Sequence, residues 1–270
     1  MKYAIFSDIH ANLEALNAVL SKCERLRVDK YISLGDIVGY NANPQECVDR
    51  IRSLDLAGAV KGNHDEYASN NSQEMEGFNP HARDAILWTK SQLNEESRQW
   101  LASLPLRSTI PQTGITIVHS TLDSPEAWGY IFDIHHAADN FSYQFTPLCF
   151  CGHSHVPIAF MKKPVTSASE KPIDEIMHWS HKRNESLVPD VVDVEDSIMI
   201  DIKSGYKYLV NVGSVGQPRN RDPRASFVVY DSVVNTLTRY RIPYDIELAQ
   251  SKIREAKLPE RLATRLLLGN

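Results

Sequence analysis

The chain has 270 residues, of which 42% are hydrophobic and 23% charged, a balance that suits a packed core and excludes a disordered protein. The formal net charge of −5 argues against a broad basic face for nucleic acid or for an anionic membrane. An acidic chain can still bind an anion where the site itself supplies positive charge.

The cysteines and the apolar segments set the expected compartment. The four cysteines show no C-x-x-C spacing, so we expect buried free thiols in a reducing environment. Asp8 interrupts the first apolar run too early for a signal peptide. No stretch approaches the ~20 apolar residues that span a bilayer. We therefore expect a cytoplasmic protein that does not enter a membrane.

The first part of the chain alternates strands with helices. Apolar runs predict strands at residues 2–7, 30–34 and 57–61. Asn12 can cap a helix whose leucines recur at helical spacing, and Pro44 can open a second helix that runs through Arg52. Repeated strand–helix–strand units indicate parallel strands that are buried between helices.

Helices and strands are also expected farther along the chain. Asn79 before Pro80, and Asn94 before an acidic stretch, each predict the start of a helix. Further strands are expected at residues 115–120, 147–152, 158–162, 197–202, 207–212, 226–231 and 237–242. We expect one domain over residues 1–270, with an irregular excursion or lid at 162–195 and a C-terminal helical tail at 246–268.

Polar side chains stand directly after several of the expected strands. These residues are Asp8, His10, Asp36, Asn63, His64, His119, His153 and His155. A single Asp in such a place is usually a turn or cap residue, and a single His is usually structural. In a parallel sheet, however, the residues past neighbouring carboxyl ends gather along one edge, where ligands bind. Together these strand ends therefore indicate a shared site.

The donor set fits a pair of divalent ions. Two carboxylates, one amide oxygen and four imidazoles suffice if one carboxylate bridges both ions. Two such ions with two aspartates leave a positive excess, which suits a hydroxide and a phosphate. A structural zinc site would use cysteine ligands, and none of the cysteines lies in these motifs. Mixed oxygen and nitrogen ligands suit manganese, iron, nickel or zinc.

The motifs SDIH, GDIVG, GNHD, VHS and GHSH follow one another in that order. With them the chain resembles the calcineurin-like metallophosphoesterases, and in particular their small bacterial phosphodiesterase branch. The resemblance covers residues 1–160 and resumes at 211–227. It implies an α/β fold in which two mixed β-sheets pack face to face with flanking helices, a four-layer α/β/β/α sandwich. It also implies two divalent metal ions, with manganese as the first choice.

The resemblance further implies roles for individual residues. Asp36 would bridge the two ions. One ion would be held by Asp8, His10 and His155, and the other by Asn63, His119 and His153. A hydroxide shared by the ions would attack phosphorus. His64 would protonate the leaving group, with Asp65 beside it to orient the imidazole.

Two further residues are expected to contact the substrate, Asn12 and Arg219. The helix that begins near Asn12 would direct its positive end at the site. Family members that resemble protein phosphatases or dinucleoside-polyphosphate hydrolases carry an arginine after the second motif, whereas GDIVGYNAN has none. This difference favours phosphodiester bonds. Arg219 or Arg221 could replace the missing arginine, which keeps phosphomonoester hydrolysis open.

A catalytically silent scaffold that binds metal and a protein partner is the alternative from another class. The complete ligand set and the presence of His64 argue against it. The expected partner is a small phosphorylated substrate, a phosphodiester or nucleotide, and a homo-oligomer stays open. The remaining histidines are expected to be exposed and without a role: His81, His135, His136, His178 and His181.

Overall fold

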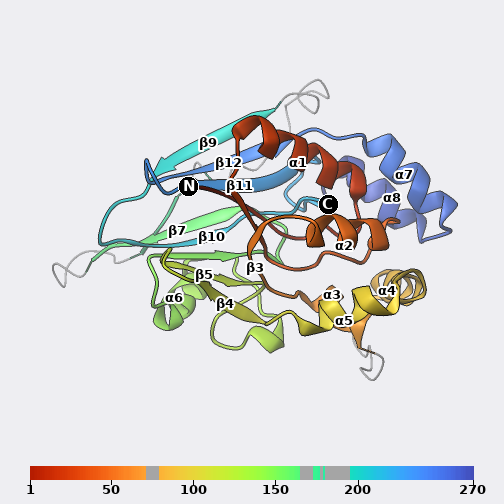
Figure 1. Cartoon of the computed structure of the whole chain (residues 1–270), viewed down its shortest axis with the longest axis horizontal. Coiled ribbons are helices and arrows are strands. Elements are labelled where there is room, and N and C mark those ends of the chain that lie inside the picture. Colours follow the sequence, from red (N-terminus) through yellow and green to blue (C-terminus); the bar gives the residue numbers. More distant parts are fainter. Residues whose placement is uncertain (71–78, 165–172, 177–178, 180–194) are drawn as a thin grey trace.

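The computed structural model describes residues 1–70, 79–164, 173–176, 179 and 195–270. These residues form two six-stranded sheets with helices around them (Figure 1). Most of the excursion expected at 162–195, together with His178 and His181, lies outside the described residues. Within the described part of the chain, no helix is both long and apolar enough to cross a membrane.

The first sheet, sheet A, joins the N-terminal strands to strands from the C-terminal half. In spatial order its strands are β3 (Leu56–Ala59), β2 (Lys30–Ser33), β1 (Lys2–Phe6), β11 (Ala225–Asp231), β12 (Thr236–Ile242) and β9 (Asp196–Asp201). The first three strands run parallel, as the strand–helix–strand pattern predicts. Beyond β1 the pairs are antiparallel, so the sheet is mixed.

The second sheet, sheet B, is built from the middle of the chain. In spatial order its strands are β4 (Arg107–Ile110), β5 (Ile115–Val118), β6 (Leu148–Cys151), β10 (Lys207–Asn211), β7 (Ile158–Lys162) and β8 (Ile173–Glu175). The three central strands, β5, β6 and β10, run parallel. The outer pairs are antiparallel, so this sheet is mixed as well.

Three helices begin where the capping residues predict. Oδ1 of Asn12 accepts a hydrogen bond from the backbone N–H of Ala15 at 3.1 Å, and Asn79 and Asn94 cap two later helices in the same way. Pro259 separates the last two helices. The helices are α1 (Leu13–Leu26), α2 (Pro44–Arg52), α3 (Asn63–Ser69), α4 (Pro80–Gln92), α5 (Glu95–Ser103), α6 (Ile134–Tyr143), α7 (Ile246–Glu255) and α8 (Glu260–Leu268).

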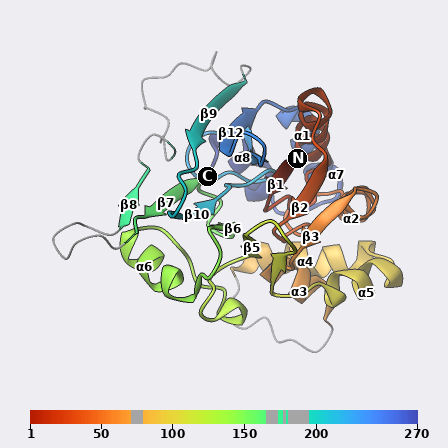
Figure 2. The same cartoon turned by 60° about the vertical axis from the view of Figure 1, so that its left-hand side comes forward.

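Side chains alternate along the strands and so divide the interior into layers. In β1, Ile5 packs between the sheets with Phe150 of β6, whereas Phe6 packs on the opposite face with α1. On the outer face of sheet B, Cys149 packs with α6. Figure 2 shows α1 outside sheet A and α6 outside sheet B. The expected four-layer sandwich is therefore confirmed, and all four cysteines are buried and free.

Among the described residues, five elements were not expected from the sequence: α3, α6, β4, β8 and the short 3-10 helix η1 (Pro125–Ala127). β4 has a mostly polar sequence, RSTI, because it is an edge strand with two exposed side chains. α3 begins inside the GNHD motif, whose residues are typical of a loop. α6 buries Ala137 and Phe141 at helical spacing, a weak signal between many polar residues. β8 lies in the segment that was expected to be irregular.

Candidate metal centre

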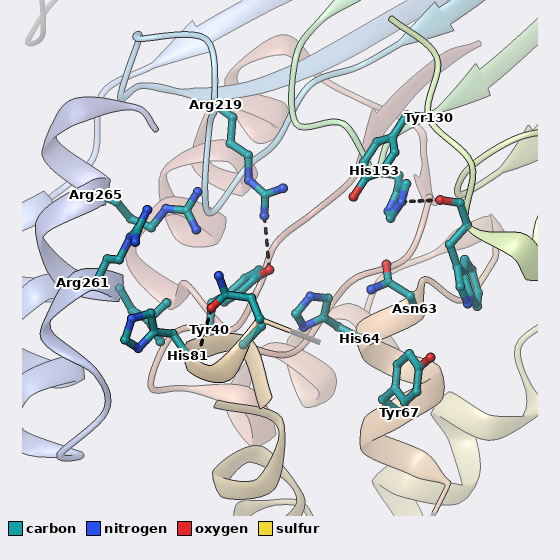
Figure 3. A pocket seen from close by; sticks show the side chains of 14 residues that line it. Tyr40, Asn63, His64, Tyr67, His81, Tyr130, His153, Arg219, Arg261 and Arg265 are labelled. Carbon is teal, nitrogen blue, oxygen red and sulfur yellow. Dashed lines mark hydrogen bonds between the residues drawn. The ribbon is translucent and has the colours of Figure 1, made fainter. Parts of the chain in front are cut away.

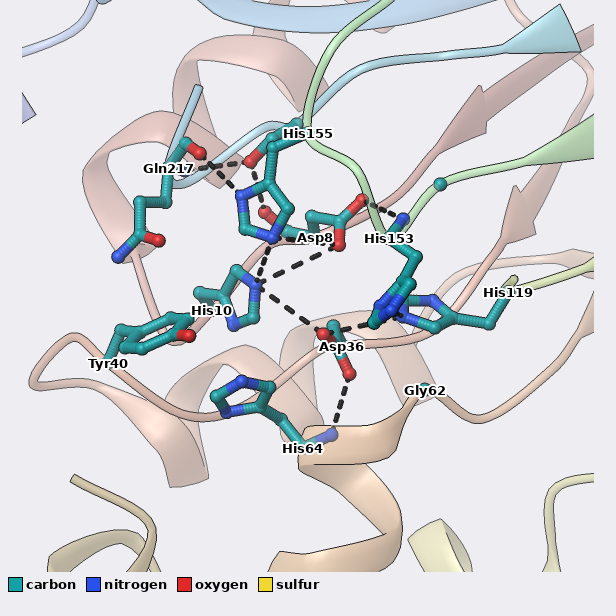
Figure 4. Close-up of polar contacts among 12 residues, drawn as sticks. Asp8, His10, Asp36, Tyr40, Gly62, His64, His119, His153, His155 and Gln217 are labelled. Carbon is teal, nitrogen blue, oxygen red and sulfur yellow. Dashed lines mark hydrogen bonds and ion pairs between the residues drawn. The ribbon is translucent and has the colours of Figure 1, made fainter. Parts of the chain in front are cut away.

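The seven candidate ligands stand just past the carboxyl ends of five strands, at one edge of the two sheets, and Figure 4 shows six of them, all except Asn63. Asp8 and His10 follow β1, Asp36 follows β2, Asn63 opens α3 after β3, His119 follows β5, and His153 and His155 follow β6. All except Asn63 are buried, and Asn63 is half-buried. The structure thus brings together side chains that are far apart in the sequence.

Four donor atoms converge at the first position. Nε2 of His10 lies 3.2 Å from Nε2 of His155 and 3.6 Å from Oδ2 of Asp36. Nε2 of His155 lies 3.3 Å from Oδ1 of Asp8. The ligand atoms of these four residues all lie within 4.8 Å of one another. A set of two carboxylates and two imidazoles at this spacing could hold one divalent ion.

The hydrogen bonds of His10 and His155 leave two lone pairs facing each other. Nδ1 of His10 lies 3.1 Å from the carbonyl oxygen of Val38, and Nδ1 of His155 lies 2.6 Å from that of Gln217. A carbonyl oxygen only accepts, so each Nδ1 carries the proton. Burial holds the pKa of both imidazoles well below its usual value, so both rings are neutral and each Nε2 presents a lone pair. A cation between these two nitrogens would remove their repulsion.

A second group shares Asp36 with the first. Oδ2 of Asp36 lies 3.4 Å from Nε2 of His119, and that nitrogen lies 3.2 Å from Nδ1 of His153. The outer ring nitrogens are held by carbonyl oxygens, Nδ1 of His119 by Leu34 at 2.7 Å and Nε2 of His153 by Trp128 at 2.8 Å. These bonds turn the inner nitrogens toward Asp36. One carboxylate therefore faces both groups of candidate ligands.

Asn63 adds an amide oxygen on the pocket side of the second group. Its Oδ1 is buried and makes no hydrogen bond within the described residues. Figure 3 shows the amide group of Asn63 directed toward the ring of His153. A buried oxygen without a donor costs ~1–3 kcal/mol, and a bound cation would satisfy it. The residues present therefore fit a pair of divalent metal ions.

The charges of the site also favour a cation. Although burial opposes ionisation, the neighbouring imidazoles of His119 and His64 hold the pKa of Asp36 well below its usual value. Burial raises the pKa of Asp8 to about 7, with a further contribution from Asp36. Burial alone would lower the pKa of His119, but Asp36 beside it raises that pKa to about 9. The space between Asp36 and His119 thus stabilises positive charge.

Most of the candidate ligands have a left-handed backbone. Their φ angles are 54° at Asp8, 49° at His10, 52° at Asp36, 67° at His153 and 60° at His155. This conformation costs a residue with a Cβ atom about 1–2 kcal/mol. Such strain persists only where the surrounding structure enforces it, and it is commonly found at functional sites. Here it directs consecutive side chains from one turn into the centre.

Two glycines allow the ligand loops to pack against one another. A Cβ atom on Gly152 would lie 1.9 Å from Oγ of Ser7 and 2.6 Å from Oδ2 of Asp8. A Cβ atom on Gly62 would lie 2.1 Å from Oδ1 of Asp36. The glycines of GHSH and GNHD are therefore required by the close approach of these loops to the two aspartates.

His64 lies next to the ligands and lines the adjoining pocket. Its backbone N–H donates to Oδ1 of Asp36 at 2.8 Å, which fixes the start of α3 against the centre. Its ring centroid lies 4.7 Å from that of His10 and 4.4 Å from that of Tyr40. Burial lowers the pKa of His64 to about 4, so the ring is neutral in the free protein.

Asp65 and Asn12 make contacts that point to positioning roles. The carboxylate of Asp65 accepts hydrogen bonds from the backbone N–H groups of Ile37 at 2.9 Å, Val38 at 3.2 Å and Gly62 at 3.1 Å. It thereby joins the loop of Asp36 to the start of α3. Asn12 caps α1, and its Nδ2 donates to the carbonyl oxygen of Gly216 at 3.0 Å. Both ends of this amide are thus engaged within the protein.

A cavity of about 450 Å³ opens beside the centre (Figure 3). Its near wall includes Asn63, His64 and His153. Arg219 lines the cavity, and its buried Nε atom has no hydrogen-bond partner within the described residues. His81 was expected to be exposed, but it is half-buried and lines this cavity because α4 begins there. His135 and His136 are exposed, as expected.

Several residues of the cavity were missed in the sequence. The ring of Tyr130 stacks on that of His153 with a centroid separation of 4.2 Å, and Trp128 also lines the cavity. No sequence pattern marks these aromatic residues. Arg261 and Arg265 contribute from α8. Their spacing of four residues on a predicted helix was a usable signal, but nothing in the sequence places α8 at this edge.

Comparison with known proteins agrees with the geometry. The model of the calcineurin-like phosphoesterase superfamily domain matches residues 1–233, and the chain therefore belongs to this family. An uncharacterized protein of Methanocaldococcus jannaschii is 38% identical over 268 residues, which are 98% of this chain and 97% of the relative. The family uses divalent metal ions, and its members are phosphoesterases.

Two solved structures resemble the whole chain. The crystal structure of a metallophosphoesterase from Sphaerobacter thermophilus is 40% identical, with a TM-score of 0.80, and the match covers 100% of this chain and 99% of that one. A hypothetical protein from Pyrococcus horikoshii is 20% identical, with a TM-score of 0.74, over 100% of this chain and 98% of that one. This second match shows that the two proteins share the same fold.

Proposed function

We propose that this phosphoesterase hydrolyses phosphodiester bonds with two divalent metal ions held at the centre. The observation that carries the proposal is the position of Asp36. Its Oδ2 atom lies 3.6 Å from Nε2 of His10 and 3.4 Å from Nε2 of His119, so one carboxylate can serve both ligand groups. Asp8 and His155 would complete the first group, and His153 and Asn63 the second.

Side chains of the protein would donate the proton and position the reacting groups. Paired divalent ions, when bound, supply an activated water and neutralise charge on the phosphoryl oxygens. His64 would donate a proton to the leaving oxygen from the wall of the cavity. Its low pKa means that it is neutral before the substrate arrives, and a phosphate anion beside it would raise that pKa. Asp65 would hold the two loops that carry Asp36 and His64.

The cavity wall favours a diester over a monoester. The loop after Asp36 offers Tyr40 to the cavity in place of an arginine. Tyr67, Trp128 and Tyr130 add aromatic surface, which suits the second ester group of a diester. A diester also carries one negative charge fewer than a monoester dianion. It therefore needs less cationic contact at the reacting phosphorus.

The test compares hydrolysis of bis-p-nitrophenyl phosphate with that of p-nitrophenyl phosphate by metal-free protein reloaded with Mn²⁺. We expect the diester to be preferred by at least about tenfold in kcat/KM, since the aromatic wall contacts only the second ester group. A preference for the monoester would refute the proposal. If the protein binds two ions but hydrolyses neither substrate, a scaffold without activity is favoured instead.

Phosphomonoester hydrolysis is the second candidate, and Arg219 favours it. Nη2 of Arg219 lies 2.9 Å from Oε1 of Gln217 and 3.3 Å from Oη of Tyr40, which holds the guanidinium at the cavity. The arginine could bind the second charge of a monoester. Arg219→Gln would then lower the kcat/KM of the monoester far more than that of the diester.

A further inference from the structure

Three arginines line the cavity, and two of them, Arg261 and Arg265, stand on the wall that lies away from the metal ligands. Arg219 comes from the loop after β10, and Arg261 and Arg265 come from α8. Because they are four residues apart, Arg261 and Arg265 share one face of the helix. Figure 3 shows the ends of both side chains close together on the same side of the cavity as His81, with Asn63, His64 and His153 farther across the cavity.

The helix that carries two of these arginines is firmly held. Leu262 and Leu266 are buried in a core cluster that also contains Tyr40 and Ala82. At the end of the helix, the carbonyl oxygen of Gly269 accepts a hydrogen bond of 2.8 Å from the backbone N–H of Arg221. These contacts tie α8 to α4 and to the loop of Arg219. The arginines are therefore presented from a packed framework.

Tyr40 lies between two of the guanidinium groups. The centre of its ring is 5.7 Å from the guanidinium carbon of Arg219 and 5.9 Å from that of Arg265. Burial lowers the pKa of Arg265 to about 10, and the positive charges of Arg219 and Arg261 add to that decrease. The positive charges of Arg219 and Arg261 thus repel that of Arg265.

Within the described residues, no acidic side chain lies in ion-pair contact with these three guanidinium groups. The side-chain contacts of Arg219 go to Tyr40 and Gln217, and Nε of Arg265 donates to the main-chain oxygen of Asn270. Elsewhere in the chain, the buried Arg224 forms an ion pair with Asp222 at 2.7 Å. Solvent could screen Arg261, which is exposed, but Arg265 is half-buried and Nε of Arg219 is buried.

We propose that Arg261 and Arg265, with His81 and Arg219, form a second phosphate-binding subsite next to the metal centre. Guanidinium groups bind phosphate through paired charge-assisted hydrogen bonds. The subsite would take a terminal phosphate of a substrate whose phosphodiester is cleaved at the metals. The preferred substrate class is then a phosphodiester that carries a second phosphate group. This inference rests on the proposed phosphodiesterase function.

The kinetic test uses two substrates that differ only in the second phosphate. One is the 5′-(p-nitrophenyl phosphate) of thymidine, and the other is the same ester with a 3′-phosphate. We expect the Mn²⁺-loaded protein to prefer the second by about tenfold or more in kcat/KM, mainly through a lower KM. In an Arg261→Gln, Arg265→Gln variant the ratio should fall to about one. The control is Arg83→Gln, which removes an exposed charge from α4 outside the cavity and should keep the preference.

A binding test separates this inference from the proposed function. Inorganic phosphate is titrated calorimetrically into the metal-free protein, where no turnover is involved. We expect phosphate to bind to the wild type and the Arg83→Gln variant, and at least about tenfold more weakly to the double variant. Equal binding by all three proteins would overturn the subsite. Phosphate binding that depends on the arginines, without turnover of either ester, would uphold the subsite and reject the phosphodiesterase.

Discussion

The Nε2 atoms of His10 and His155 lie 3.2 Å apart, although 145 residues separate the two histidines in the sequence. Each ring is fixed by a carbonyl oxygen on its other nitrogen, from Val38 and from Gln217. Two nitrogens that each lie about 2.1 Å from one ion, at a near-right angle, are separated by about 3 Å. The loops after β1 and β6 thus hold the two imidazoles at a separation that would suit a shared cation.

Removal of the shared carboxylate should affect both metal positions. We expect Asp36→Asn to bind fewer than two Mn²⁺ ions per chain and to lose at least about 100-fold in kcat, because the amide is neutral and has one oxygen. Elemental analysis after gel filtration gives the metal content. The matched control is Asp49→Asn, an exposed aspartate on α2, which should keep both ions. Two tightly bound ions in Asp36→Asn would contradict the proposed bridging role.

Replacement of His64 should depend on the leaving group. Its ring lines the cavity next to His10, and we expect His64→Ala to lower kcat about 10²–10⁴-fold for an alkyl diester such as thymidylyl-thymidine. The loss for bis-p-nitrophenyl phosphate should be below about tenfold, since p-nitrophenolate leaves without a proton. Exposed His135→Ala is the control. Equal losses on both substrates would rule out proton donation by His64.

The close approach of the GHSH loop to the residues after β1 can be tested with a substitution that adds one methyl group. We expect Gly152→Ala to displace Asp8, because the new Cβ atom would lie 2.6 Å from its Oδ2 and 1.9 Å from Oγ of Ser7. Metal affinity should fall about 10–100-fold and stability by about 1–3 kcal/mol. A double variant that combines Gly152→Ala with Ser7→Gly lacks the nearest clash. It should regain part of the metal affinity and part of the stability. No change in the single variant would show that the loops can move apart.

A buried ion pair outside the centre should give a defined pH dependence. Asp222 accepts from Nη2 of Arg224 at 2.7 Å and lies 3.8 Å from Nε of Arg241. Burial opposes ionisation, but these arginines hold the pKa of Asp222 below its usual value. The stability it contributes is therefore present above the unfolded pKa of about 3.9 and is lost as pH falls through the folded pKa.

We expect Asp222→Asn to destabilise the protein by about 3 kcal/mol at pH 7, because it removes the nearest carboxylate from the buried side chains of Arg224 and Arg241. The difference from the wild type should shrink as pH falls below about 4, where the wild-type carboxylate also loses its charge. Urea unfolding at several pH values measures both quantities. Asp231→Asn, which removes a carboxylate that caps a surface turn, is the comparison. A difference that stays constant down to pH 3 would exclude the ion pair as the cause.

The sequence predicted the parallel strands and the convergence of the candidate ligands because both depend on local pattern. Asp8, Asp36 and Asn63 each follow a strand at intervals of one strand–helix–strand unit, and parallel pairing then brings them to one edge. The antiparallel partner β11 joins β1 across more than two hundred residues, and no local pattern encodes such a pairing. The two sheets were therefore expected from the family resemblance alone.

The cavity wall was not predictable for a related reason. Arg261 and Arg265 reach the site because Leu262 and Leu266 pack with Tyr40, a contact between distant parts of the chain. Asp65 follows His64 directly in the sequence, yet its carboxylate turns to the backbone of Ile37 and Val38. Neighbours in the sequence point in different directions from the first turn of a helix, which the motif alone does not reveal.

The left-handed backbone of five candidate ligands has a consequence for how long the protein survives in a cell. Together their conformational strain amounts to roughly 5–10 kcal/mol, which is comparable to the whole stability of a typical domain. Ions that bind only the folded chain would offset this strain. A chain deprived of metal would then open more often and be degraded by proteases sooner. Metal scarcity would thus deplete the protein itself, and no inactive reserve would accumulate for later use.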